Sequence, residues 1–368
     1  MKIPYLDLSV KDVSLKNELL QAVDRVLSHG RILLGPEVEQ FEKKVAEFCQ
    51  KKYAVGVNSG TDALYLALRS LDVGPGDEVI TTPLSWIATL NAITLCGANP
   101  VFVDIKEDLN INADLIDEVI TPKTKAILPV HFTGKLCNMD KITQIAKRRD
   151  VVVVEDAAQA FGAHLNGAMA GSFGLVNSLS MNPMKVFCAY GEAGAIVTDD
   201  EKLYQKLLSL RYAGTINKEN CHYPSLNGRL DTIQAAMLLV NFKYLQNKIE
   251  RRREIAEYYS ESLNDVVIWP RAEKGYYHIY YTYTIITEKR DELKEYLQSC
   301  GIETKIHHPI LMPYHTAYTG LPKFNLPVAE KLVNCILSIP NHENLMHEER
   351  EYITTCIRRF YGFARVRH

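Results

Sequence analysis

The sequence predicts an α/β protein, with a large domain built on a mixed, mostly parallel sheet and a smaller C-terminal α/β domain. Three observations support this fold class. Short apolar runs alternate with helical patterns between residues 53 and 200, as in a parallel sheet covered by helices on both faces. Residues 151–154 are consecutive valines, as expected for a strand buried on both faces. The chain has 368 residues, more than one compact core usually takes.

The expected elements follow in chain order. Helical spacing predicts helices at 62–71, 87–96 and 139–149, then one long helix at 232–263 and a helix at 291–300 that ends at Gly301. Apolar and β-branched runs predict strands at 53–57, 78–82, 101–105, 126–131, 151–155, 178–181 and 195–198, and an aromatic-rich strand at 277–287. We therefore place the large domain at 1–245 and the small domain at 246–368.

Composition argues against several classes of function. The formal net charge is −2 and no basic stripe is present, so we expect no nucleic-acid partner. The eight cysteines form no C-x-x-C pair, and no His or Cys spacing matches a metal site, so we expect no metal. Scattered free cysteines suit a reducing compartment. No signal peptide or membrane-spanning run is visible, which predicts a cytoplasmic protein without a membrane partner.

A turn that suits phosphate follows the first predicted strand. Gly60 and Thr61 open a helix within the run NSGTDAL. A helix N-terminus offers unpaired N–H groups and a positive dipole end to an anion, and Gly60 permits a close approach. Ordinary N-capping by Ser59 or Thr61 is the simpler interpretation of the turn taken alone. The run is not G-x-G-x-x-G, which disfavours a dinucleotide-binding dehydrogenase.

Two polar residues follow the valine strand in the run EDAAQ. Asp156 lies where doubly wound sheets bind ligands, at the C-terminal end of a strand. A carboxylate there can pair with a protonated pyridine nitrogen, and Gln159, one helical turn further, can reach a ring hydroxyl. Capping of the next helix by Asp156 is the alternative.

A lysine follows a later predicted strand in the run SMNPMK. Most loop lysines are simply solvated, but burial or neighbouring charge makes a lysine amine reactive enough to form a Schiff base with pyridoxal phosphate (PLP). Lys185 is therefore a candidate for that role, and Ser180 a candidate second phosphate ligand. Trp86 follows the strand at 78–82 and can stack on a flat ring, although plain packing is the alternative.

The motifs SGTDALYLAL, EDAAQAFGA, SMNPMKVFCAYGEAGAIVTDD and NGRLDTIQAAML occur in the order and spacing of the DegT/DnrJ/StrS family of sugar aminotransferases. The resemblance covers essentially the whole chain. It implies a fold-type-I PLP transferase that forms a homodimer with shared active sites, in which Lys185 is the catalytic, Schiff-base lysine. It also implies contacts to the cofactor and substrate: Asp156 at the pyridine nitrogen, Gln159 at the ring hydroxyl, Gly60, Thr61 and Ser180 at the phosphate, Trp86 over the ring, Asn227 at the phosphate of the partner's site, and Arg229 and His308 at the nucleotide-sugar.

Motif detail resembles members that aminate carbon 3 of UDP-linked 2-acetamido sugars, with L-glutamate as the usual donor. Such amino sugars serve polysaccharide or lipid A biosynthesis. Two alternatives remain open: amination of carbon 4 of a UDP- or dTDP-4-keto-6-deoxy sugar, and a non-catalytic regulator of the same fold that binds PLP or a sugar. Lys185 argues against the family's dehydratases, which have a histidine there. Asn182 departs from the S-F-H-P or S-F-Y-P run of many members.

Overall fold

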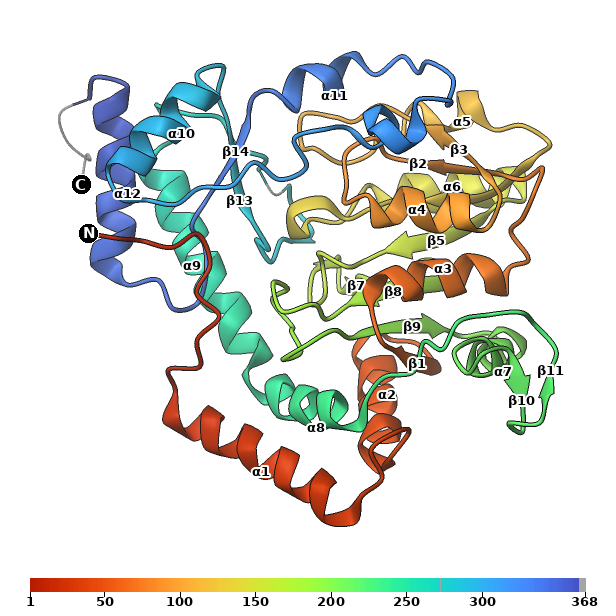
Figure 1. The fold of residues 1–368 in the computed structure, drawn as a ribbon. Helices are drawn as coiled ribbons and strands as arrows, with labels where there is room; N and C mark the ends of the chain where they lie inside the picture. Colours follow the sequence, from red (N-terminus) through yellow and green to blue (C-terminus); the bar gives the residue numbers. More distant parts are fainter. Residues whose placement is uncertain (272, 364–368) are drawn as a thin grey trace.

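A seven-stranded mixed sheet forms the centre of the molecule (Figure 1). The computed structural model describes residues 1–271 and 273–363. Strand β9 runs antiparallel to β1 and β8, whereas the other neighbours are parallel, so the predicted α/β class with a mixed, mostly parallel sheet is confirmed. In spatial order the strands are β1 (Tyr53–Val57), β9 (Gly194–Thr198), β8 (Val176–Ser180), β5 (Val152–Asp156), β4 (Thr124–Leu128), β2 (Glu78–Thr81) and β3 (Asn99–Phe102).

Helices cover both faces of this sheet. Val153 packs into the cluster beneath one set of helices and Val154 into the cluster beneath the other, because successive strand residues face opposite sides. The valine strand is therefore buried on both faces, as predicted. One face is covered by α2 (Pro36–Phe48), α6 (Met139–Arg149) and α8 (Thr232–Asn241), and the other by α3 (Gly60–Ser70), α4 (Ala88–Leu95) and α7 (Glu201–Leu210).

The single long helix predicted at 232–263 is wrong. The structure has α8, a 3-10 turn η2 (Phe242–Tyr244) and then α9 (Leu245–Ser262), which leaves in a different direction (Figure 1). The aromatic ring of Phe242 packs against Phe41 and Phe187 and makes further ring contacts in the core. Helix propensity alone would continue the helix through residues 242–244. The helix breaks at the point where Phe242 packs into the core, so tertiary packing overrides propensity here.

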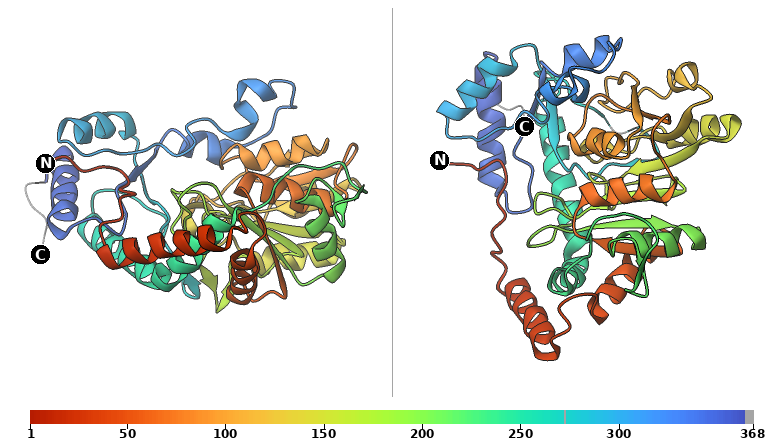
Figure 2. Two further views of the ribbon diagram at one scale, coloured as in Figure 1. Left: turned by 60° about the horizontal axis from the view of Figure 1, so that its bottom comes forward. Right: turned by 45° about the vertical axis from the view of Figure 1, so that its right-hand side comes forward.

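A second hydrophobic core lies beside the sheet domain and contains the C-terminal elements (Figure 2). Ile3 from the N-terminal segment is part of it and forms a bridge with Ile302. The second core thus contains residues from both ends of the chain. The domain boundary at residue 245 stays a prediction. The elements of this second core are α9, α10 (Arg290–Ser299), α12 (His347–Phe360) and the antiparallel pair β13 (Tyr283–Ile286) and β14 (Ile336–Ile339).

The predicted strand at 277–287 is split in two. Strand β12 (Tyr276–Tyr277) pairs with β6 (His164–Leu165), and β13 belongs to the second core, with an irregular segment between them. The remaining elements are short or peripheral: α1 (Val13–His29), α5 (Ile116–Val119), α11 (Pro327–Leu332), η1 (Phe132–Gly134), η3 (Met312–Tyr314), η4 (Thr316–Tyr318), β7 (Ala168–Met169), β10 (Thr215–Ile216) and β11 (Asn220–Cys221).

Candidate active site

A cavity of about 560 Å³ opens at the C-terminal ends of β1, β2, β5 and β8. Ligands gather at this edge in doubly wound sheets. Most residues predicted for the site line this one cavity, although they are scattered along the sequence. They are Gly60, Thr61, Trp86, Asp156, Gln159, Ser180, Lys185 and His308.

The turn between β1 and α3 forms a tight cradle with the end of β8. A Cβ atom on Gly60 would lie only 2.5 Å from the Cβ of Ser180, so only glycine fits there. Ser59 caps α3 by accepting a hydrogen bond from the Asp62 N–H at 3.0 Å. The capping interpretation is therefore correct for Ser59, and Gly60 and Thr61 still face the cavity at the positive end of the helix.

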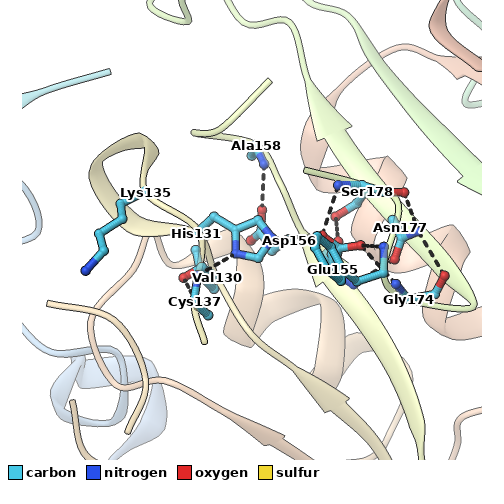
Figure 3. Close-up of polar contacts among 12 residues, drawn as sticks. Val130, His131, Lys135, Cys137, Glu155, Asp156, Ala158, Gly174, Asn177 and Ser178 are labelled. Atoms are coloured by element: carbon cyan, nitrogen blue, oxygen red, sulfur yellow. Dashed lines mark hydrogen bonds and ion pairs between the residues drawn. The ribbon is translucent and has the colours of Figure 1, made fainter. Parts of the chain in front are cut away.

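Asp156 is the last residue of β5, and its side chain is buried with 3% exposure. Its carboxylate accepts a hydrogen bond from the Thr89 hydroxyl at 2.9 Å. It accepts another from the Ala158 N–H at 3.2 Å (Figure 3). Burial raises the pKa of Asp156, and these bonds and the nearby Lys185 charge oppose the rise without cancelling it. A cationic group in the cavity would stabilise the ionised carboxylate.

Glu155 is a buried residue that the sequence analysis did not single out. Its carboxylate accepts hydrogen bonds from His131 Nε2 at 2.8 Å and from three backbone N–H groups, those of Gly171, Phe173 and Gly174 (Figure 3). Burial raises the pKa of Glu155, but these hydrogen bonds outweigh it and the net shift is downward. A carboxylate at the end of a strand buried on both faces must have such donors, which is the signal that predicts this network.

Lys185 lies in the loop after β8, where its N–H donates to the Asn182 carbonyl at 2.8 Å. Its Nζ lies 4.5 Å from the ring centre of Tyr281, a cavity residue that sequence reasoning missed because it fell within the predicted strand at 277–287. The Asn182 side chain donates to Glu192 Oε1 at 2.7 Å, and both side chains also line the cavity.

Trp86 and His308 are neighbours in the lining of the cavity. The Trp86 side chain is 62% exposed, and its ring centre is 5.9 Å from that of His308. Exposure of so large an apolar ring leaves room for a flat ligand to cover it. Burial and the neighbouring Lys185 charge lower the pKa of His308 to about 3, so this imidazole is neutral near pH 7.

Asn227 and Arg229 do not line this chain's cavity. The Arg229 Nε donates to Asn227 Oδ1 at 2.7 Å, and the guanidinium stacks on Tyr212 at 4.5 Å from the ring centre. The segment is held to the end of β1, because Arg229 forms a bridge with Val57 and the Asn58 N–H donates to the Gly228 carbonyl. The segment is therefore anchored next to the cradle, with Asn227 exposed and Arg229 half-buried.

The model of the DegT/DnrJ/EryC1/StrS aminotransferase family matches residues 13–358. The chain belongs to this family. The predicted family and enzyme class, a PLP-dependent sugar aminotransferase, are thus confirmed.

Three curated relatives of this aminotransferase are similar over nearly their whole lengths. The pleiotropic regulatory protein of Geobacillus stearothermophilus is 40% identical over 98% of this chain and 99% of its own. A dTDP-3-amino-3,4,6-trideoxy-alpha-D-glucose transaminase of Streptomyces venezuelae is 38% identical, with 97% and 96% covered. A UDP-N-acetyl-3-dehydro-alpha-D-glucosamine 3-aminotransferase of Acidithiobacillus ferrooxidans is 37% identical, with 97% of each chain covered.

Solved structures give the same picture. Streptomyces venezuelae DesV superposes with a TM-score of 0.95 at 38% identity, covering 98% of this chain and 99% of its own. Bacillus subtilis NtdA, solved with bound cofactor PMP, has a TM-score of 0.89 at 32% identity, with 97% and 84% covered. Spr1654 of Streptococcus pneumoniae, solved in a PLP form, has a TM-score of 0.87 at 28% identity, with 93% and 95% covered. The predicted PLP cofactor is confirmed for the family.

Within residues 1–271 and 273–363, no helix is both long and apolar enough to cross a membrane. In the same ranges, no three His, Cys, Asp or Glu side chains gather in a way that would hold a metal ion.

Proposed function

We propose that this aminotransferase moves an amino group from L-glutamate to carbon 3 of a UDP-linked 2-acetamido-3-keto-hexose. One observation supports the chemistry above all. The Lys185 amine and the buried Asp156 carboxylate line a single cavity, which also contains the cradle at Gly60. The cavity volume of about 560 Å³ lies in the usual range for small-molecule sites.

The residues of the cavity suit PLP. The cradle leaves no room for a Cβ at Gly60 and lies at a helix N-terminus, which suits a phosphate. Asp156, whose pKa is raised by burial, suits a cationic pyridine nitrogen. When bound, the cofactor supplies an aldehyde carbon and an electron-withdrawing ring. We assign the contacts as follows: Lys185 at the aldehyde, Asp156 at the ring nitrogen, Gln159 at the ring hydroxyl, Trp86 over the ring, and Gly60, Thr61 and Ser180 at the phosphate.

The protein's own residues then divide the work. Lys185 is the general base that moves the proton at the α-carbon of the amino donor, a role worth roughly 10²–10⁴-fold in rate. Asp156 keeps the ring nitrogen positive, because an uncompensated buried carboxylate is costly. His308, which is neutral near pH 7, offers a hydrogen bond to the sugar rather than a charge.

The active form in this proposal is a homodimer with shared sites. Asn227 and Arg229 lie outside their own chain's cavity, yet Asn227 is exposed, Arg229 is half-buried, and both are anchored to the strand that ends at the cradle. A two-fold axis near this edge would bring them to the partner's phosphate and sugar, since a two-fold contact is reciprocal. An obligate interface of roughly 2,000 Å² or more is expected.

The choice of carbon 3 is supported by the relatives' names. The Streptomyces venezuelae relative is named for a dTDP-linked 3-amino sugar, and the Acidithiobacillus ferrooxidans relative is named as a 3-aminotransferase of a UDP-linked 3-dehydro sugar. Amination at carbon 4 of a UDP- or dTDP-4-keto-6-deoxy sugar is the competing outcome. The amino sugar would serve polysaccharide or lipid A biosynthesis, and nucleotide-linked substrates and eight free cysteines fit a cytoplasmic location.

Mass spectrometry of product tests this proposal. The PLP-loaded protein is incubated with L-glutamate and a panel of UDP- and dTDP-linked 3-keto and 4-keto sugars. We expect amino-sugar formation from the UDP-linked 2-acetamido-3-keto-hexose with the highest kcat/KM, and a rate at least roughly 10²–10⁴-fold lower with Lys185→Ala. Preference for a 4-keto sugar would overturn the choice of carbon, and preference for dTDP the choice of nucleotide.

A second candidate function is regulatory. The Geobacillus stearothermophilus relative, 40% identical, is named a pleiotropic regulatory protein. A PLP-binding regulator needs no reaction with an amino donor. Bound PLP absorbs visible light, so added L-glutamate should bleach the colour of an aminotransferase. Colour that persists with every amino donor would favour the regulator.

A further inference from the structure

The orientation of the Gln159 amide is fixed by a backbone group of a neighbouring turn. The Thr133 N–H donates a hydrogen bond to Gln159 Oε1 at 3.0 Å. Because the amide oxygen is held there, Nε2 faces the other way, and within the described chain it has no protein acceptor. Gln159 lines the cavity, so it presents a hydrogen-bond donor to whatever the cavity holds.

Thr133 adopts a backbone conformation that a β-branched residue rarely takes. It lies in η1 with φ 60 and ψ −2. The left-handed region is costly for such a residue and persists only when its surroundings hold it. Thr133 is also buried, with 2% exposure, which places the strained turn inside the molecule.

The ring of His278 helps to hold this turn. Its Nδ1 accepts a hydrogen bond from the Tyr280 N–H at 2.9 Å, and burial lowers the pKa of the imidazole to about 3. The ring is therefore neutral with its hydrogen on Nε2, which donates to the Thr133 hydroxyl at 3.4 Å. His278 stacks on the ring of Tyr280 with centres 3.9 Å apart, which fixes the plane of the imidazole.

The next residue presses the turn against the segment that carries Tyr281. Gly134 has φ 97, and a Cβ there would lie 2.8 Å from Ile279 Cγ1 and 2.9 Å from the Tyr281 nitrogen. The Ile279 N–H donates to the Gly134 carbonyl at 3.2 Å. The η1 turn therefore contacts two parts of the cavity wall: the segment with Tyr281, which lies beside Lys185, and Gln159.

We propose that Thr133 is a positioning residue: its strained backbone, held by His278, aims the Gln159 amide so that a donor faces the ring of the cofactor. The inference rests on the proposed function, in which Gln159 contacts the ring hydroxyl. Thr133 acts through Gln159 and touches neither cofactor nor substrate in this arrangement. Its effect should therefore vanish when Gln159 can no longer donate.

A double-mutant cycle on PLP affinity tests this dependence. The PLP dissociation constant is measured by fluorescence titration for the unsubstituted protein, Thr133→Gly, Gln159→Leu and the double variant. Glycine adopts φ 60 without strain but loses the hydroxyl that His278 contacts and makes the turn more mobile. We expect Thr133→Gly to weaken binding by about two- to tenfold, the range for one hydrogen bond. In the Gln159→Leu background its effect should fall below about 1.5-fold.

Two further variants separate positioning from general destabilisation. Thr133→Gly relieves the strained φ but also removes a buried hydroxyl, so its Tm is measured beside its PLP affinity; a loss of affinity that persists in the Gln159→Leu background marks general destabilisation. Thr133→Asn tolerates the left-handed backbone and keeps an acceptor for His278, so it should retain PLP affinity. Asp150→Gly is the matched control. It removes a similar strain, with φ 56, at the exposed C-terminal end of α6, and it should not change PLP affinity.

The outcomes distinguish this inference from the proposed function. If PLP does not bind the unsubstituted protein, the proposed function fails and the role of Thr133 fails with it. If PLP binds normally but Thr133→Gly binds it equally well, only the positioning role is overturned. The same holds if the loss of affinity persists in full in the Gln159→Leu background.

Discussion

Gly60→Ala tests the cradle on which the phosphate contact depends. The added methyl carbon would lie 2.5 Å from Ser180 Cβ and 2.8 Å from its Oγ. Non-bonded carbon atoms settle at roughly 3.5–4.0 Å, so the start of α3 and the end of β8 must separate by about 1 Å. Overpacking of this kind typically costs about 1–3 kcal/mol. For a chain of 368 residues, the expected fall in Tm is about 1–4 °C.

The same shift should weaken PLP binding. Each 1.4 kcal/mol of lost binding energy is tenfold in affinity, so displacement of the α3 N-terminus should raise the PLP dissociation constant by about tenfold or more. Differential scanning fluorimetry of the PLP-free protein gives the Tm, and fluorescence titration gives the affinity. Gly320→Ala is the matched control, because nothing lies within 4 Å of a Cβ at that exposed position.

A compensating variant makes the test specific. Adding Ser180→Gly to Gly60→Ala removes the side chain that the methyl group meets, so most of the lost Tm should return. PLP affinity should stay low, since the Ser180 hydroxyl is gone. A Gly60→Ala protein with the Tm and PLP affinity of the Gly320→Ala control would refute the close approach of α3 and β8.

Four other predictions follow from the same geometry. Lys185→Ala should lower activity by at least roughly 10²–10⁴-fold while still folding. Because burial raises the pKa of Asp156, the PLP-free protein should lose stability as the pH rises from the ordinary carboxyl range to the raised pKa. Asp156→Asn should remove this pH-dependent fall in Tm and should weaken PLP binding. Because the pKa of His308 is lowered to about 3, the folded protein should lose stability as pH falls below about 6.5; His308→Asn should reduce that loss. Mixing equal amounts of Lys185→Ala and Asn227→Ala subunits, each of low activity alone, should bring the activity to about one quarter of the unsubstituted value, because half the dimers are mixed and each has one intact site.

Each of these has a contradicting result. Full activity in Lys185→Ala would remove the lysine from the mechanism. A pH–Tm curve for Asp156→Asn or His308→Asn that parallels the unsubstituted protein would show that burial does not shift these groups as described. Mixed subunits that stay inactive after exchange would leave Asn227 without a role across the interface.

Sequence patterns predicted the sheet because the hydrophobicity of consecutive residues shows whether a strand is buried on one face or on both. Consecutive valines before Glu155 indicated a strand covered on both faces, and Val153 and Val154 do pack to opposite sides. The motif around Lys185 carried the family resemblance, and the family model confirms it over residues 13–358. The predictions from hydrophobic period and composition were wrong at two places where packing overrides propensity: the helix that breaks at Phe242 and the strand predicted at 277–287.

The sequence by itself determined the fold class, the family and the residue types that the chemistry needs. Only the tertiary structure decided which of them share a cavity, and it left Asn227 and Arg229 outside it. It also showed Tyr281 beside Lys185 and Thr133 holding the amide of Gln159. Those contacts join residues far apart in the chain, and no local pattern encodes them. They depend on where the sheet, the turn at η1 and the segment before β13 meet, which is set by packing of the whole core.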